Sequence, residues 1–159
     1  MISSCSRFSN CSTIAPVNRL LLLLAASCSY KAGSFSDFRG AYPGTHQTIG
    51  CIDLAVGRSA DPAASGPAIS YSFGNRCLHP VTIDLASIHA RGHDADGLEH
   101  ALVAFDPLQE LRPLPLDSLF FGRETIEYSA RIPLPIYDVC VDIGGVNGDE
   151  PHSATWVCP

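Results

Sequence analysis

The densest group of side chains that could do chemistry is the segment from His89 to His100, which holds three histidines and three carboxylates in twelve residues. Imidazole and carboxylate groups are ligands for zinc and calcium. The spacing, however, lacks both the His-Glu-x-x-His pair of a zinc hydrolase and the closing glutamate of a calcium loop. We therefore predict a solvated hairpin loop, no cofactor, and a weak divalent-cation site as the alternative. The candidate ligands for that alternative are His89, His93, Asp94, Asp96 and His100.

Nucleophilic catalysis finds no support in the sequence. Ser59 and Ser65 stand in Gly- and Pro-rich surroundings, without the strand-turn-helix context of a nucleophile elbow. The carboxylate pairs Glu124/Glu127 and Asp138/Asp142 fall where we predict the solvent-facing sides of strands, not an acid/base pair. We predict that the protein is not an enzyme and has no catalytic residues.

The elements expected to position these side chains are short strands. Ile69, Tyr71 and Phe73 alternate with serines, and comparable alternation recurs between Gly, Pro and Asn clusters. Period two indicates antiparallel strands with one buried and one wet face. The fold class predicted is all-β, an antiparallel β-sandwich of immunoglobulin-like kind with about seven or eight strands and two disulfides. The predicted strands are 48–56, 68–75, 81–89, 100–106, 112–116, 124–132, 137–144 and 154–158, with one helical turn at 116–121.

The seven cysteines divide by position. Cys5 and Cys11 precede an apolar run and Cys28 follows it, which leaves an even set of four. That set is Cys51, Cys77, Cys140 and Cys158. In an oxidising compartment four cysteines predict two disulfides. All three connectivities stay open, and proximity in the chain mildly favours Cys51 with Cys77 and Cys140 with Cys158.

The apolar run itself predicts export. Arg19 precedes the run Leu20–Ala26, and Ser27 and Cys28 close it, in the order of a secretory signal. A run of seven residues is too short for the ~20 that a membrane-spanning helix needs. The stretch Leu-Ala-Ala-Ser-Cys resembles the lipobox of bacterial lipoproteins, except that alanine stands where leucine is favoured. The resemblance implies cleavage before Cys28, acylation of that cysteine and attachment to a lipid membrane.

This reading divides the chain into three parts. Residues 1–27 are the predicted signal peptide, and 1–16 are predicted to be a mis-annotated start if translation begins at Val17. Residues 28–47 are a predicted lipid-anchored tether, which as a coil would span roughly 25 Å. Its aromatic residues could instead pack on the domain or lie at the membrane interface. Residues 48–159 are the predicted β domain.

Charge narrows the choice of partners. The formal charge is −6 with a single lysine, Lys31, and becomes −8 once Arg7 and Arg19 leave with the signal. This excludes nucleic acid as a partner, because phosphate binding needs clustered basic residues. Ser29 occupies the position where an aspartate would favour the inner membrane, so the expected location is the cell envelope, at the outer membrane. The predicted function is a non-catalytic surface module that binds a ligand or protein. The alternatives are a structural component of an envelope complex, and a metal binder or enzyme using the His89–His100 loop.

Overall fold

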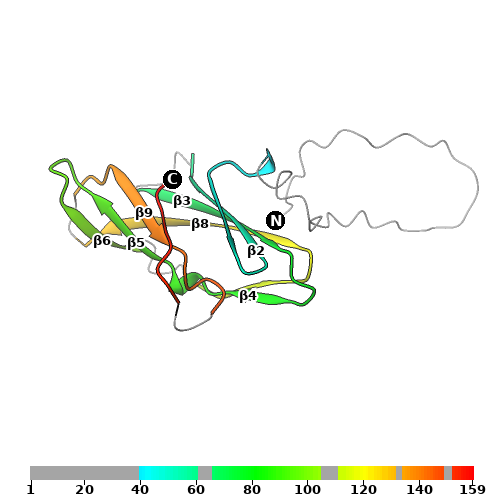
Figure 1. Ribbon diagram of the computed structural model, residues 1–159. Coiled ribbons are helices and arrows are strands. Elements are labelled where there is room, and N and C mark those ends of the chain that lie inside the picture. The colour runs from blue at the N-terminus through cyan, green and yellow to red at the C-terminus, as the bar shows by residue number, and fades with distance from the viewer. Residues whose placement is uncertain (1–39, 61–65, 105–110, 132–133, 149–151) are drawn as a thin grey trace, which may run out of the picture.

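The computed structural model describes residues 40–60, 66–104, 111–131, 134–148 and 152–159, and within them almost all regular structure is β (Figure 1). The predicted signal, Cys28 and most of the predicted tether lie outside the described residues. The elements are β1 (Thr45–Ile49), β2 (Ile52–Arg58), β3 (Ala68–Asn75), β4 (Val81–Ile83), the 3-10 turn η1 (Leu85–Ser87), β5 (His89–His93), β6 (Glu99–Ala104), β7 (Leu114–Leu116), β8 (Phe121–Ala130), β9 (Asp138–Asp142) and β10 (Trp156–Val157).

All strand pairs are antiparallel, as predicted. Eight strands form one sheet in the order β1-β2-β3-β8-β6-β5-β9-β10, and β4 pairs with β7 in a second sheet. Strand β8 joins the two halves of the large sheet. Its first residues pair with β3, from Gly74 opposite Phe121 to Ala68 opposite Glu127. Its last residues, Tyr128 to Ala130, pair with β6.

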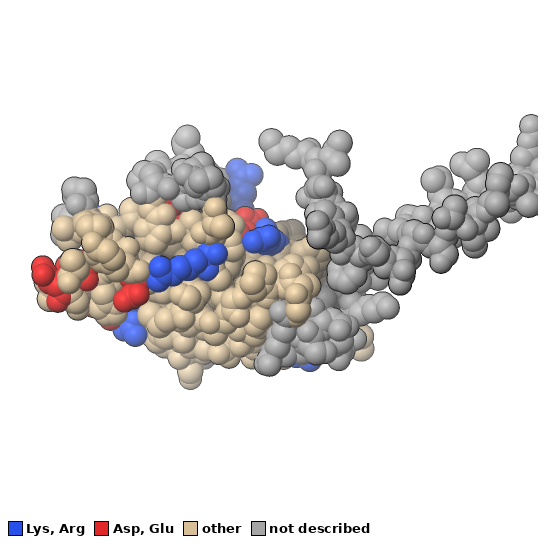
Figure 2. All heavy atoms as spheres, turned by 90° about the horizontal axis from the view of Figure 1, so that it is seen from above, with Lys and Arg blue, Asp and Glu red and all other residues tan. Residues whose placement is uncertain are grey.

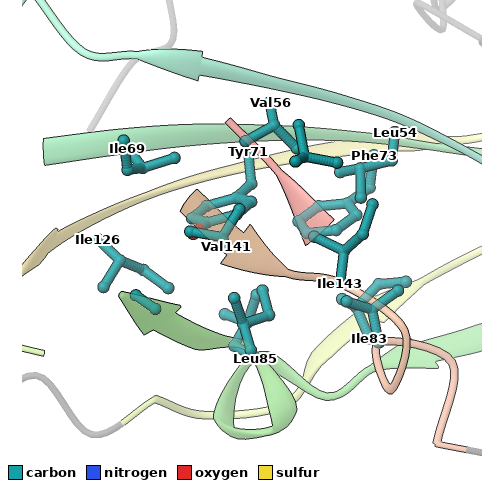
Figure 3. Packing of buried hydrophobic residues seen from close by; sticks show 14 of the residues in the cluster. Leu54, Val56, Ile69, Tyr71, Phe73, Ile83, Leu85, Ile126, Val141 and Ile143 are labelled. Carbon is teal, nitrogen blue, oxygen red and sulfur yellow. The ribbon is translucent and has the colours of Figure 1, made fainter. Parts of the chain in front are cut away.

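The large sheet folds over around a single core. Leu54, Val56 and Phe73 of β2 and β3 belong to the same buried cluster as Val139 and Val141 of β9, although these strands lie far apart in the sheet order (Figure 3). Arg58, at the end of β2, bridges the same two parts of the sheet on the outside. It donates to the carbonyl oxygens of Tyr137 at 3.1 Å and Pro159 at 3.2 Å. The sheet thus encloses a continuous apolar interior, whose burial is the main stabilising term.

Both disulfides have the connectivity that proximity favoured. Cys51 is joined to Cys77, and Cys140 to Cys158. The first disulfide links the turn before β2 to the loop after β3, and the second fastens the C-terminal residues beside β9.

Two predicted strands are each divided by a turn. The run 48–56 is a hairpin of β1 and β2, because Gly50 adopts a φ of 58° that reverses the chain between Ile49 and Ile52. The first strand begins at Thr45, so the last three residues of the predicted tether lie in the sheet. The run 81–89 contains β4, then η1, and ends at His89, the first residue of β5. Asp84 starts η1 by accepting a hydrogen bond from the N–H of Ala86.

The predicted helical turn at 116–121 is wrong. Residues 117–120 form a tight turn between β7 and β8, closed by a hydrogen bond from the N–H of Phe120 to the carbonyl oxygen of Asp117. Leu119 has a φ of 63°, a left-handed conformation that leucine rarely adopts. A right-handed helix cannot continue through such a residue.

The prediction of a wet outer face is wrong for β3, which is buried along its whole length. Ser70 and Ser72 alternate with the core residues but are 8% and 5% exposed. Ser70 shares a hydrogen bond of 2.9 Å with Thr125 on β8. Alternation alone did not reveal that a central strand with small side chains is covered on both sides.

The end of the predicted tether contacts the domain, as one of the alternatives for its aromatic residues predicted. The ring of Tyr42 lies 5.4 Å from that of Phe121.

Candidate functional site

The chemically richest segment forms the hairpin of β5 and β6. His93 pairs with Glu99 at the end of the ladder, and residues 94–98 make the turn. The N–H of Asp94 donates to the carbonyl oxygen of Leu98, and Gly97 supplies a φ of 78°. The turn therefore lies where the sequence predicted it. The rest of the predicted solvated loop is wrong, because residues 89–93 and 99–100 belong to β5 and β6, and Ala90 and Gly92 are buried.

Asp94 is fully engaged in holding this turn together. One carboxylate oxygen accepts hydrogen bonds from the N–H groups of Asp96 at 2.9 Å and Leu98 at 3.0 Å. The other oxygen lies 2.7 Å from Nε2 of His100. The hydrogen bond from His100, followed by that from Leu98, holds the pKa of the Asp94 carboxyl below its ordinary value. This carboxylate serves the turn, because both of its oxygens already accept hydrogen bonds.

The other side chains of the segment do not gather around Asp94 into a metal site. Glu99 lies 3.0 Å from Arg91 and 3.9 Å from His93. The Arg91 guanidinium stacks 4.0 Å from the centre of the Trp156 ring. His89 and Asp96 are exposed. Within the part of the chain that the structure describes, no three His, Cys, Asp or Glu side chains are placed so that they could hold a metal ion.

We expect the hairpin turn to respond to acid through Asp94. Because the folded-state pKa is lowered, the charged carboxylate stabilises the fold above the ordinary pKa, and this contribution is lost as the pH falls below about 4 through the lowered value. An NMR titration of the Asp96 and Leu98 amides should give a midpoint below that of an ordinary aspartate. In His100→Ala the midpoint should rise. A wild-type midpoint at the ordinary value, or one unchanged by His100→Ala, would contradict this prediction.

The side chains of two carboxylates that were predicted to face solvent, Asp142 and Glu124, are buried or half-buried. Asp142 is 6% exposed, and one of its oxygens accepts from the N–H groups of Gly144 at 3.0 Å and Thr155 at 2.7 Å. It therefore ties β9 to the C-terminal residues. Glu124 stands opposite Tyr71 in the β3–β8 register, so it leaves the sheet on the same face as that core residue and is half-buried. Asp138 is exposed, as predicted.

Two tyrosines in the core share a hydrogen bond. The hydroxyl groups of Tyr71 and Tyr128 are 2.7 Å apart and buried. Burial raises the pKa of Tyr128 to about 12 and that of Tyr71 well above its ordinary value. Both phenols are therefore neutral near pH 7, and their hydrogen bond satisfies two buried hydroxyls inside the fold.

At the end of the molecule opposite the β5–β6 turn (Figure 1), Asn75 organises the loop after β3. This side chain is fully buried. Its oxygen accepts from the N–H of Cys77 at 2.7 Å, and its Nδ2 lies 3.0 to 3.1 Å from the carbonyl oxygens of His79, Leu116 and Asp117. One amide thus fixes the loop after β3 to the turn before β8.

A shallow cavity of about 250 Å³ lies beside this loop and the Cys51–Cys77 disulfide. Ile49, Ile52 and Val81 supply apolar walls, and His79 and Asn147 supply polar ones. The sequence did not single out these residues, because they come from three separate segments that only the fold brings together.

The same end exposes large apolar side chains. Leu78 is 90% exposed, Phe120 44% and Phe121 41%. The two loops that carry them are fastened together, because the Ser118 hydroxyl donates to the carbonyl oxygen of Cys77 at 2.7 Å. We call Leu78, Leu119, Phe120 and Phe121 the apolar tip. The run Leu119-Phe120-Phe121 is the signal for it in the sequence, but it falls within the predicted helical turn 116–121.

These features define an all-antiparallel β protein that is held by two disulfides and carries contrasting ends. No protein-family model matches the chain, and neither the curated proteins nor the solved structures contain a match to it. None of the described segments forms a helix long and apolar enough to cross a membrane.

Proposed function

We propose that this protein is a lipid-anchored module of the bacterial cell envelope, attached through Cys28, that works by binding and not by catalysis. Its expected partners are the lipid membrane and other envelope proteins. The proposal joins the export signal in the sequence to the chemistry of the folded part.

The observation that carries the proposal is the pairing of all four cysteines that follow Cys28. They form Cys51–Cys77 and Cys140–Cys158. Such bonds persist in oxidising compartments such as the bacterial periplasm and the cell surface, to which the predicted signal would direct the chain.

The arrangement of the two ends supports a binding role. Asp94 and His100, the most closely associated acid and base of the hairpin, are occupied with each other and with the turn. The opposite end presents apolar side chains on loops fixed by Asn75 and a disulfide. Rigid loops with exposed apolar residues are typical of interaction surfaces.

Acylation can be tested on the full-length chain in a bacterial host. Cells grown with an alkyne analogue of palmitate should label the wild-type protein, and Cys28→Ser should abolish the label because the acceptor sulfur is gone. Cys11→Ser, a control that removes a cysteine upstream of the predicted cleavage site, should keep it. A label that persists in Cys28→Ser, or a mature N-terminus upstream of residue 28 by mass spectrometry, would refute the proposal.

A further inference from the structure

We propose that the apolar tip, Leu78 with Leu119, Phe120 and Phe121, docks into the surface of the membrane that holds the anchor. This inference rests on the proposed acylation of Cys28 and adds to it a second contact with lipid. It also fixes which end of the domain faces away from the membrane.

The apolar tip is exposed, and the loops that carry it are rigid. Leu78 is 90% exposed, the highest value among the large apolar side chains that the structure describes. It follows Cys77, whose sulfur is in a disulfide and whose N–H is held by Asn75. Because the Leu78 side chain is almost fully exposed, it contributes little to the stability of the fold. Its apolar surface is available for a partner.

Backbone strain at the neighbouring turn supports the same conclusion. Leu119 is held at a φ of 63° in the turn between β7 and β8, directly before Phe120 and before Phe121, the first residue of β8. A left-handed backbone is unfavourable for leucine, because its Cβ lies too close to the following carbonyl oxygen. Strain of this kind persists where the surrounding structure enforces it, and it is concentrated at functional sites.

The chain enters the domain beside the apolar tip. Tyr42 is two residues from the first described residue, Gly40, and its ring lies 5.4 Å from that of Phe121. The twelve residue steps from Cys28 to Gly40 reach at most about 40 Å when fully extended. An acylated Cys28 would therefore keep the membrane close to the side of the domain that carries the apolar tip.

Charge is distributed unevenly between the two ends of the domain. Acidic side chains are gathered at the end of the molecule that carries the β5–β6 turn (Figure 2), where Asp94, Asp96 and Glu99 lie. Near the tip the exposed Arg123 follows Phe121 by two residues, and the turn 117–120 carries one acidic residue, the exposed Asp117, against the three at the other end. Anionic lipid attracts basic residues and repels acidic ones, which favours the same orientation. Leucine and phenylalanine side chains enter the boundary between headgroups and acyl chains. A lipid surface thus fits both the chemistry and the position of the tip.

The test places a tryptophan at each end of the acylated, full-length protein in vesicles made with brominated phospholipid, which quenches tryptophan on contact. The chain has one tryptophan, Trp156, which Trp156→Phe removes in both variants. Leu78→Trp then reports on the tip. Leu98→Trp is the matched control, because Leu98 is 62% exposed in the turn at the acidic end. Both side chains are exposed, so neither replacement disturbs the core.

We expect brominated lipid to reduce the emission of Leu78→Trp by about half and to leave Leu98→Trp unchanged, as insertion of the tip by about 5 Å requires. Adding Phe120→Asp to Leu78→Trp should restore most of the emission. Equal emission in brominated and ordinary lipid for Leu78→Trp would overturn the inference, and so would equal quenching at the two ends. Palmitate labelling in the same samples separates the two proposals. Label without quenching refutes the docking alone, whereas absence of label refutes the anchor and, with it, this inference.

Discussion

Removing the Cys51–Cys77 disulfide should lower the free energy of unfolding by about 3 to 4 kcal/mol, since the bond closes a loop with a sequence separation of 26 residues. The double replacement Cys51→Ala/Cys77→Ala avoids leaving a reactive thiol. Urea denaturation of the purified, oxidised protein, followed by circular dichroism, measures the loss. For a domain of this size such a loss is a large part of a total stability of about 5 to 15 kcal/mol.

The second disulfide provides the comparison. Cys140–Cys158 closes a shorter loop, with a separation of 18 residues, so Cys140→Ala/Cys158→Ala should lose about 3 kcal/mol. We expect the first pair to cost at least as much, because Cys77 also anchors the loop that carries Leu78. A loss below about 1 kcal/mol for Cys51→Ala/Cys77→Ala would show that the hydrogen bonds of Asn75 hold this region without the disulfide.

Asn75→Ala should destabilise the fold by about 3 kcal/mol, which is large for the loss of one polar side chain. Asn75 is fully buried, and its removal leaves the Cys77 N–H and three carbonyl oxygens without the partner they share. It also leaves a small cavity at the end of β3. Urea denaturation gives the size of the effect, and hydrogen exchange should show faster opening of the loop at Cys77.

Ser118→Ala is the matched control, because Ser118 joins the same two loops through a single hydrogen bond to the carbonyl oxygen of Cys77. Its cost should be about 1 kcal/mol. If Asn75→Ala cost no more than Ser118→Ala, the amide would not have the organising role that its four contacts assign to it.

The class of fold could be predicted from the sequence, and proximity in the chain mildly favoured the observed disulfide pairing while leaving the other two connectivities open. The alternation through Ile69, Tyr71 and Phe73 reflects a strand whose inner face is apolar, and the structure confirms that all three are core residues. Cys51 and Cys77 flank two strands that pair as neighbours, so closeness in the chain became closeness in space.

The missed features depend on contacts between distant segments. The burial of Ser70 and Ser72 depends on the cover of a central strand, which a pattern within that strand does not encode. In the sequence Asp142 resembles a surface carboxylate, because the residue that donates a hydrogen bond to it, Thr155, is thirteen positions away. The split of the run 48–56 could have been anticipated, because Gly50 is the residue type most suited to a left-handed turn.

The candidate site shows the same division. Clustering in the sequence drew attention to His89–His100, and the hairpin turn there lies where it was predicted. The apolar tip was missed, because Leu78 and Phe120 are forty-two residues apart, and strand pairing together with the hydrogen bonds of Asn75 and Ser118 brings their loops together. Chemistry that is local in sequence can be predicted from the sequence, whereas a surface assembled from distant loops cannot.

The division of β8 between two partner strands has a consequence for how the chain folds. Pairing of β8 with β3 joins residues from 47 (Gly74 and Phe121) to 59 (Ala68 and Glu127) positions apart, and such non-local contacts make folding slow. The meander of β1, β2 and β3 needs only nearby residues and contains its own disulfide, Cys51–Cys77. If the chain is exported from its N-terminus, as we propose, this part can form and oxidise before β8 has crossed the membrane. Cys140 and Cys158 follow β8 in the chain, so the order of synthesis favours two native disulfides over crossed ones.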